Sequence, residues 1–115
     1  MSYCRFSNGD VYMYPHVYGG IECCACCLSG SSLTFFRRSE AIAHLQEHRK
    51  AGYIVPDHAF DALRSEIEDE GDEVVLDIEE SAKLYEMTPE SLRRKVEKYM
   101  AGVKIVQNLQ IEFTE

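Results

Sequence analysis

The chain contains no long hydrophobic run. A helix that spans a membrane needs about 20 consecutive apolar residues, and no such stretch occurs among the 115 residues. The first ten residues also lack the apolar core of an export signal. We therefore expect a cytoplasmic protein that makes no contact with a membrane.

The sequence also lacks the motifs of several enzyme classes. It has no Gly-rich phosphate-binding loop, no His-Glu-x-x-His pair and no Pro-Cys-x-x-Cys deaminase pattern. We therefore expect neither an enzyme nor a small-molecule substrate.

Basic residues are few, and the acidic excess is concentrated in one part of the chain. Twelve Lys and Arg against 20 Asp and Glu give a net charge of −8. Residues 57–80 hold eleven acidic residues and one basic residue, a net charge of −10, so the remainder carries +2. The densest stretch lies within the acidic block 66–80, which is interpreted as a solvated boundary between two units or as a surface for a basic partner.

Cysteine is the most informative residue type in this sequence. Five cysteines are present, and four of them form the run Cys23-Cys24-Ala25-Cys26-Cys27. An odd count and adjacent cysteines argue against a disulfide framework. An iron–sulfur cluster would need a distant thiolate as well, such as Cys4.

The cysteine run precedes two histidines with the spacing of a zinc site. Structural Zn²⁺ takes four thiolate or imidazole ligands, commonly a C-x2-C pair and two His near each other on a helix. His44 and His48 stand at positions i and i+4, which lie on one helix face. The predicted ligands are Cys23, Cys26, His44 and His48, with Cys24 and Cys27 as the alternative pair because they satisfy the same spacing; His16 and His58 could replace a ligand if the fold brings either one near.

The segments around these ligands predict a ββα finger. Residues 21–24 and 32–36 are short β-prone runs separated by a turn. Residues 39–51 have the composition of a helix, with Ser39 as the expected N-cap and Gly52 just beyond the end. A further helix is expected after Asp57, which could cap it.

Two helix starts follow the acidic stretch in quick succession. Asp77 can cap the first helix, and Thr88 followed by Pro89 marks the second. The second helix has an apolar stripe and an outer face with basic side chains, namely Arg93, Arg94, Lys95 and Lys98. Gly102 is expected to end it, and residues 105–113 are predicted to form a strand. The predicted class is α+β, with a zinc-finger-like unit over residues 1–70 and a helix-turn-helix-like unit over residues 74–115.

The N-terminal half resembles small zinc-finger-like proteins of actinobacteria and their phages. The similarity covers about 65 residues and includes Ser2-Tyr3-Cys4-Arg5, Cys23-Cys24-Ala25-Cys26, the stretch from His44 to Gly52, and Val55-Pro56. The resemblance implies a small zinc protein of phage or prophage origin in a bacterial cell. It implies no particular biochemical activity.

Residues 75–105 resemble the helix-turn-helix of excisionase and MerR-like regulators. The matching residues are Ala82, Thr88, Pro89, Leu92, Arg93 and Arg94. Glu86 departs from that pattern, since the family usually has a turn Gly there, and Lys95 stands where an aromatic is common. The resemblance implies that Arg93, Arg94 and Lys98 face double-stranded DNA.

Two functional hypotheses follow. The first is a zinc-stabilised regulator of phage or prophage transcription that binds DNA through its C-terminal helix-turn-helix. The second is a zinc-finger module that binds a host protein, with the acidic block as part of the contact surface.

Overall fold

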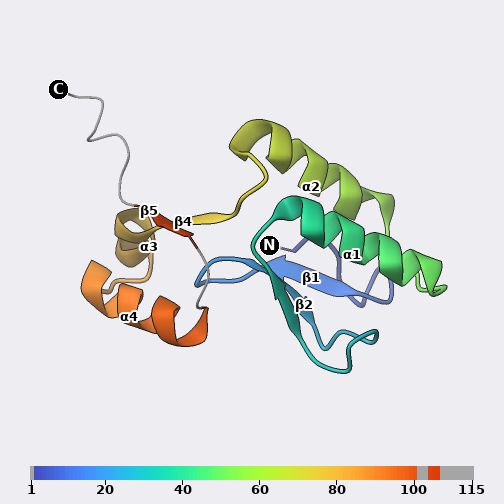
Figure 1. Cartoon of the computed structure of the whole chain (residues 1–115), viewed down its shortest axis with the longest axis horizontal. Coiled ribbons are helices and arrows are strands. Elements are labelled where there is room, and N and C mark those ends of the chain that lie inside the picture. The colour runs from blue at the N-terminus through green and yellow to red at the C-terminus, as the bar shows by residue number, and fades with distance from the viewer. Residues whose placement is uncertain (1, 101–103, 107–115) are drawn as a thin grey trace.

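The computed structural model describes residues 2–100 and 104–106, and within these residues it has an α+β architecture. A three-stranded antiparallel sheet precedes the helices, and two short strands, one before and one after the last two helices, pair in parallel (Figure 1). The predicted fold class is confirmed. The elements are β1 (Tyr12–Pro15), β2 (Ile21–Cys24), β3 (Leu33–Phe35), α1 (Arg38–Lys50), α2 (Asp57–Glu70), β4 (Val75–Asp77), α3 (Ile78–Leu84), α4 (Pro89–Tyr99) and β5 (Lys104–Val106).

Strand β2 is the centre of the antiparallel sheet. Its residue Cys23 lies opposite Met13 of β1 and opposite Leu33 of β3. Because successive side chains of a strand point to opposite faces, Ile21 and Cys23 are buried while the residues that alternate with them are only half-buried. The strand therefore turns Cys23 toward the core and Cys24 toward the other face.

Helix α1 packs against this sheet, and α2 packs against α1 (Figure 1). Ala41, Leu45 and His48 are buried on α1 at spacings of four and three, so they form one face of the helix. Ala41 and Leu45 belong to a core cluster that also contains Met13, Ile21, Val55, Phe60 and Leu63, among other residues.

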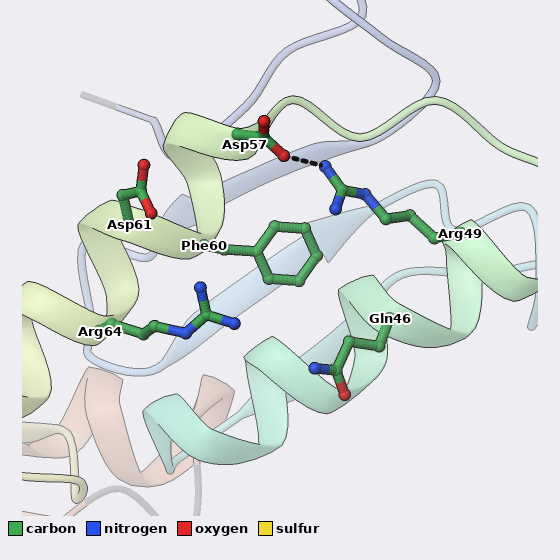
Figure 2. A pocket seen from close by; sticks show the side chains of 6 residues that line it. All are labelled: Gln46, Arg49, Asp57, Phe60, Asp61 and Arg64. Carbon is green, nitrogen blue, oxygen red and sulfur yellow. Dashed lines mark hydrogen bonds and ion pairs between the residues drawn. The ribbon is translucent and has the colours of Figure 1, made fainter.

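A pocket with mostly polar lining residues lies between α1 and α2. Figure 2 shows Phe60 between two guanidinium groups. The Cζ atom of Arg49 lies 4.4 Å from the centroid of the Phe60 ring, and the Cζ atom of Arg64 lies 5.6 Å from it. Arg49 also forms an ion pair of 2.8 Å with Asp57.

The start of α2 differs from the prediction. Asp57 is the first residue of this helix, and the prediction that it caps the helix is wrong because Pro56 occupies the N-cap position.

The start of α1 also differs from the prediction. The N-cap residue is Arg37 and not Ser39, and no local side chain caps the helix. Instead Asp72, which is distant in sequence, accepts hydrogen bonds from the Ser39 amide at 2.7 Å and from its hydroxyl at 2.8 Å. The first residue of α1, Arg38, is buried and contacts a carboxylate oxygen of Glu66 at 3.0 Å.

The C-terminal helices begin where the sequence predicts. The Asp77 carboxylate accepts hydrogen bonds from the backbone amides of residues 79 and 80, and the Thr88 hydroxyl accepts one from the Ser91 amide. Pro89 is the first residue of α4. Between the two helices Glu86 has a φ of 54°, a left-handed conformation that a glycine adopts more easily.

Strand β5 pairs in parallel with β4, which brings both ends of the C-terminal segment together. The described strand, Lys104–Val106, overlaps the predicted region 105–113 at residues 105 and 106, and residues 107–113 and Gly102 lie outside the described part. Leu76, Ile78, Ala82, Leu92, Val96 and Met100 form a second core cluster. Tyr18, from the loop between β1 and β2, packs against this cluster and stacks on Tyr99 with ring centroids 6.0 Å apart. The division into units at residues 1–70 and 74–115 stays a prediction.

Among the described residues, every helix is too short or too polar to cross a membrane.

Candidate metal centre

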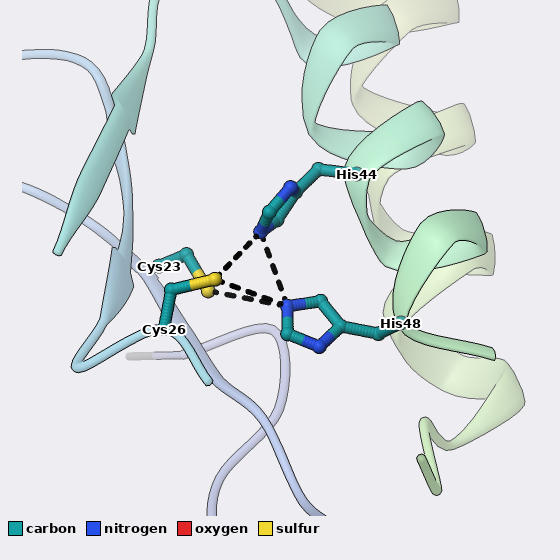
Figure 3. Close-up of side chains that lie close together, drawn as sticks. All are labelled: Cys23, Cys26, His44 and His48. Carbon is teal, nitrogen blue, oxygen red and sulfur yellow. Dashed lines mark hydrogen bonds between the residues drawn. The ribbon is translucent and has the colours of Figure 1, made fainter. Parts of the chain in front are cut away.

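Two cysteines from the sheet side and two histidines from α1 converge on one point. Cys23 is on β2, Cys26 follows in the turn after this strand, and His44 and His48 lie one helical turn apart on α1 (Figure 3). One ligand atom from each of the four side chains lies within 4.8 Å of the other three. The structure thus brings together the four residues that the sequence predicts as ligands.

The separations between these atoms fit one tetrahedral zinc ion. The Cys26 sulfur lies 3.3 Å from His44 Nε2 and 3.5 Å from His48 Nε2, and the Cys23 sulfur lies 3.6 Å from His48 Nε2. The two Nε2 atoms are 3.1 Å apart. Bonds of about 2.3 Å to sulfur and about 2.0–2.1 Å to nitrogen would place tetrahedral S and N ligands about 3.5 Å apart and two N ligands about 3.4 Å apart. Hence one ion fits between the four atoms with little adjustment.

A tight turn holds the two cysteines in this position. Ala25, between them, has a left-handed φ of 47°, and its amide donates a hydrogen bond of 3.0 Å to the Ser32 hydroxyl. The turn continues past Cys26, whose carbonyl accepts a hydrogen bond from the Gly30 amide at 2.9 Å. The turn therefore directs both sulfur atoms toward α1.

The surroundings change the pKa of all four groups. Burial is the main reason why the pKa of Cys23 is raised, and the nearby charge of Cys26 adds to the increase. Burial also acts to raise the pKa of Cys26, but hydrogen bonds from the backbone at Ser29 and Leu28 outweigh it, so the net shift is downward. Burial lowers the pKa of both histidines, which favours the neutral imidazole that a metal requires.

The site is closed from solvent on most sides. Cys23, Cys26 and His48 are buried, and His44 is half-buried against the ring of Phe35, with centroids 4.9 Å apart. Two thiolates and two imidazoles are a donor set that suits Zn²⁺, and four protein ligands leave no open position for a substrate. The arrangement therefore provides four protein ligands that could hold one metal ion.

The alternative residues are not part of this group of four ligand atoms. Cys24 is on the opposite face of β2, and Cys27 is exposed, with its sulfur 3.6 Å from Nδ1 of His48, which is the other ring nitrogen. The side chain of His16 faces Glu22 at 3.8 Å, and His58 is exposed at the start of α2. The sequence does not predict the contact of Cys27 with His48, because no spacing rule describes such a contact.

The residues predicted to bind DNA lie on α4. Arg94 and Lys98 are exposed and stand at positions i and i+4, so they share one stripe of the helix. Lys95 is exposed beside them, whereas Arg93 is half-buried and lies about 100° from Arg94 around the helix axis. The structure therefore places Arg94 and Lys98 together and Arg93 on a neighbouring face.

Comparisons with protein-family models, with curated proteins and with solved structures found no match to this chain.

Proposed function

We propose that this chain is a zinc-binding regulatory protein of phage or prophage origin that binds double-stranded DNA through α4 in the cytoplasm of a bacterial cell. The observation that supports zinc binding is the group of four ligand atoms from Cys23, Cys26, His44 and His48. Since the site is closed, the ion has a structural role and holds the sheet against α1.

The geometry of the C-terminal segment supports DNA binding. Helix α3, a tight turn and α4 follow each other, with Ala82, Leu92 and Val96 buried between the helices and β4. This packing leaves the opposite side of α4 to solvent, where Arg94, Lys95 and Lys98 are exposed. Three cations on one exposed helix surface of an otherwise acidic chain match the phosphates of DNA.

Zinc binding is tested by native mass spectrometry with elemental analysis. We expect one zinc per chain in the unmodified protein and none after the double substitution His44→Ala, His48→Ala. Retention of zinc by the double variant would exclude this site, and absence of metal from the unmodified protein would exclude zinc binding altogether.

DNA binding is tested by fluorescence anisotropy with a random-sequence duplex over a range of salt concentrations. The triple variant Arg93→Ala, Arg94→Ala, Lys98→Ala should bind more weakly, and the slope of log K against log salt should fall by about 1 for each lost phosphate contact. Among the single variants, Arg93→Ala should have the smallest effect because this side chain is half-buried on a neighbouring face.

A charge-matched control separates a local contact from a change in net charge. Arg5, Lys50 and Arg64 are exposed and lie outside α3 and α4, so their triple substitution by Ala removes the same charge. The control should bind DNA as the unmodified protein does. Equal affinity of the α4 triple variant and the unmodified protein would exclude α4 as the DNA-binding helix.

The second candidate function is binding to a host protein through the acidic surface. Glu68, Asp69 and Glu70 are exposed at the end of α2, where they could contact a basic partner. Glu66 is not available in the same way, because it accepts hydrogen bonds from Tyr3 at 2.7 Å and from Arg38 at 3.0 Å.

Affinity capture from a host lysate tests this alternative. A variant with Glu68→Gln and Asp69→Asn keeps the Glu66 contacts and the 3.6 Å ion pair between Glu70 and Arg38, and removes only exposed charge. A host protein captured by the unmodified chain but not by this variant would support the second function. Capture of the same proteins by both would argue against the acidic surface.

A further inference from the structure

Both ring nitrogens of His48 have a neighbour in the protein. Nε2 points to the ligand group, with the sulfur of Cys26 at 3.5 Å and that of Cys23 at 3.6 Å. Nδ1 lies on the other side of the ring, 3.6 Å from the sulfur of Cys27. The two nitrogens therefore have different partners, and only one of them can bind the metal.

Metal binding decides which nitrogen carries the proton. A ligating nitrogen uses its lone pair for the metal, so in a neutral imidazole the proton must be on the other nitrogen. For His48 the ligating atom is Nε2, which leaves the proton on Nδ1. Since His48 has 0% of its surface exposed, this N–H needs an acceptor within the protein.

Cys27 is placed to accept that hydrogen bond. A cysteine sulfur is a weak acceptor, and 3.6 Å is within the range for hydrogen bonds to sulfur. Tyr53 contacts His48 as well. Its amide donates a hydrogen bond of 3.0 Å to the His48 carbonyl, and its ring packs edge to face against the His48 ring, with centroids 5.9 Å apart.

We propose that Cys27 is a positioning residue of the metal site, which holds His48 with Nδ1 protonated and Nε2 free for the metal. This proposal rests on the proposed zinc binding and adds a role for a cysteine that is not itself a ligand. The partner of a metal-bound histidine orients the ring and raises its basicity, and its removal commonly costs 10–100-fold in metal affinity, by order of magnitude. Because Cys27 is exposed, water can partly replace it, and we expect a loss of about 10-fold.

Zinc affinities of three variants test the proposal by competition with a chromogenic chelator. Cys27→Ala should weaken zinc binding by about 10-fold, and Cys27→Ser should recover most of this loss because a hydroxyl oxygen also accepts from N–H. Cys24→Ala is the matched control, since this neighbouring thiol lies on the opposite face of β2, and it should leave the affinity unchanged. Equal affinities in the Cys27→Ala and Cys24→Ala variants would overturn the proposal.

Nitrogen NMR provides a readout that a change in packing alone would not alter. In the zinc-loaded unmodified protein, long-range ¹H–¹⁵N spectra should show His48 protonated at Nδ1, with a proton that exchanges slowly. In Cys27→Ala this proton should exchange rapidly with water. A His48 ring that is protonated at Nε2, or a proton whose exchange is the same in both proteins, would contradict the positioning role.

Cobalt substitution separates a positioning residue from a ligand. The intensity of the thiolate-to-Co²⁺ charge-transfer band depends on the number of sulfur ligands, so Cys27→Ala should leave it unchanged while Cys26→Ala lowers it. A lower band in Cys27→Ala would make Cys27 a ligand and refute the proposal. Failure of the unmodified protein to bind zinc or cobalt would instead refute the proposed zinc function, and the role of Cys27 with it.

Discussion

Removal of zinc should lower the free energy of unfolding of the N-terminal half by about 4 kcal/mol. A ligand that binds only the folded state stabilises it by about 4.1 kcal/mol when its free concentration is about 1,000 times Kd. The four ligands are distributed over β2, the following turn and α1, so loss of the ion removes the link between the sheet and the helix that covers it. The perturbation is chelation of the zinc-loaded protein, with the double variant His44→Ala, His48→Ala as control.

The first core cluster is small, so the ion should provide a large share of the stability of the N-terminal half. Its buried residues fall between Tyr3 and Leu63, and a core formed by fewer than about 70 residues rarely supplies more than about 3–5 kcal/mol. The ion would therefore contribute about as much as the rest of the core. For a unit of this size, 1 kcal/mol corresponds to about 4–8 °C in Tm, so chelation should lower Tm by roughly 15–30 °C.

Thermal unfolding followed by circular dichroism measures this difference. The unmodified protein is scanned at a series of free zinc concentrations and in excess chelator, and the double variant is scanned in the same buffers. We expect Tm to increase with zinc only in the unmodified protein. A Tm that is the same with zinc and with chelator would refute the argument that the ion replaces a larger core, as would an equal response of the double variant.

Further predictions concern contacts away from the ligands and the zinc-free state. Arg38→Ala should lower the free energy of unfolding by about 3 kcal/mol, because it leaves Glu66, whose side chain is only 19% exposed, without its cationic partner. Urea denaturation measures this loss, and a loss below about 1 kcal/mol would contradict the buried ion pair. Leu92→Ala in the second core cluster should lower the free energy of unfolding by about 2–5 kcal/mol, and Thr88→Ala should lower it by about 1 kcal/mol through the lost cap of α4. The exposed control Glu90→Ala should change it by no more than about 0.5 kcal/mol. Similar values for all three variants would show that α4 is not packed and capped as described. In the zinc-free protein, burial holds the pKa of both ligand imidazoles below the ordinary 6.5. Below pH 6.5 the unfolded chain therefore binds more protons than the folded chain, and the free energy of unfolding should fall as the pH decreases through 6.5. Denaturation midpoints that do not change across this pH would show that the imidazoles are not buried in the neutral form.

The ligand set could be predicted from spacing only up to a point. The i, i+4 spacing was enough for His44 and His48, since helix geometry alone puts them on one face. The cysteine pair stayed open because both C-x2-C pairs satisfy the same rule. The pairing register of β2 distinguishes them, as Cys23 faces the core between Met13 and Leu33 and Cys24 faces away. Strand register depends on pairing with residues of β1 and β3, which lie outside the cysteine run, so the run of four cysteines does not contain this information.

Helix starts show the same contrast between local and distant causes. Asp77 and Thr88 cap their helices through amides two or three residues further along, and both were predicted. The amide near the start of α1 is satisfied by Asp72, which lies 33 residues beyond Ser39, and no local pattern indicates it. Glu86 is a different case, because the resemblance to helix-turn-helix proteins marks this position as one that usually holds Gly, and its left-handed φ of 54° gives the physical reason.

The position of the four ligands along the chain has a consequence for synthesis on the ribosome. All of them lie between residues 23 and 48, so the metal site is complete once this segment has left the exit tunnel. Contacts between residues close in sequence form fastest, and N-terminal segments fold first during translation. The Asp72 contact with Ser39 and the parallel pairing of β4 with β5 need residues that emerge later. We therefore expect a nascent chain that is stalled just after α1 has left the exit tunnel to bind zinc already, with the acidic stretch and the C-terminal helices added onto a metal centre that has formed before them.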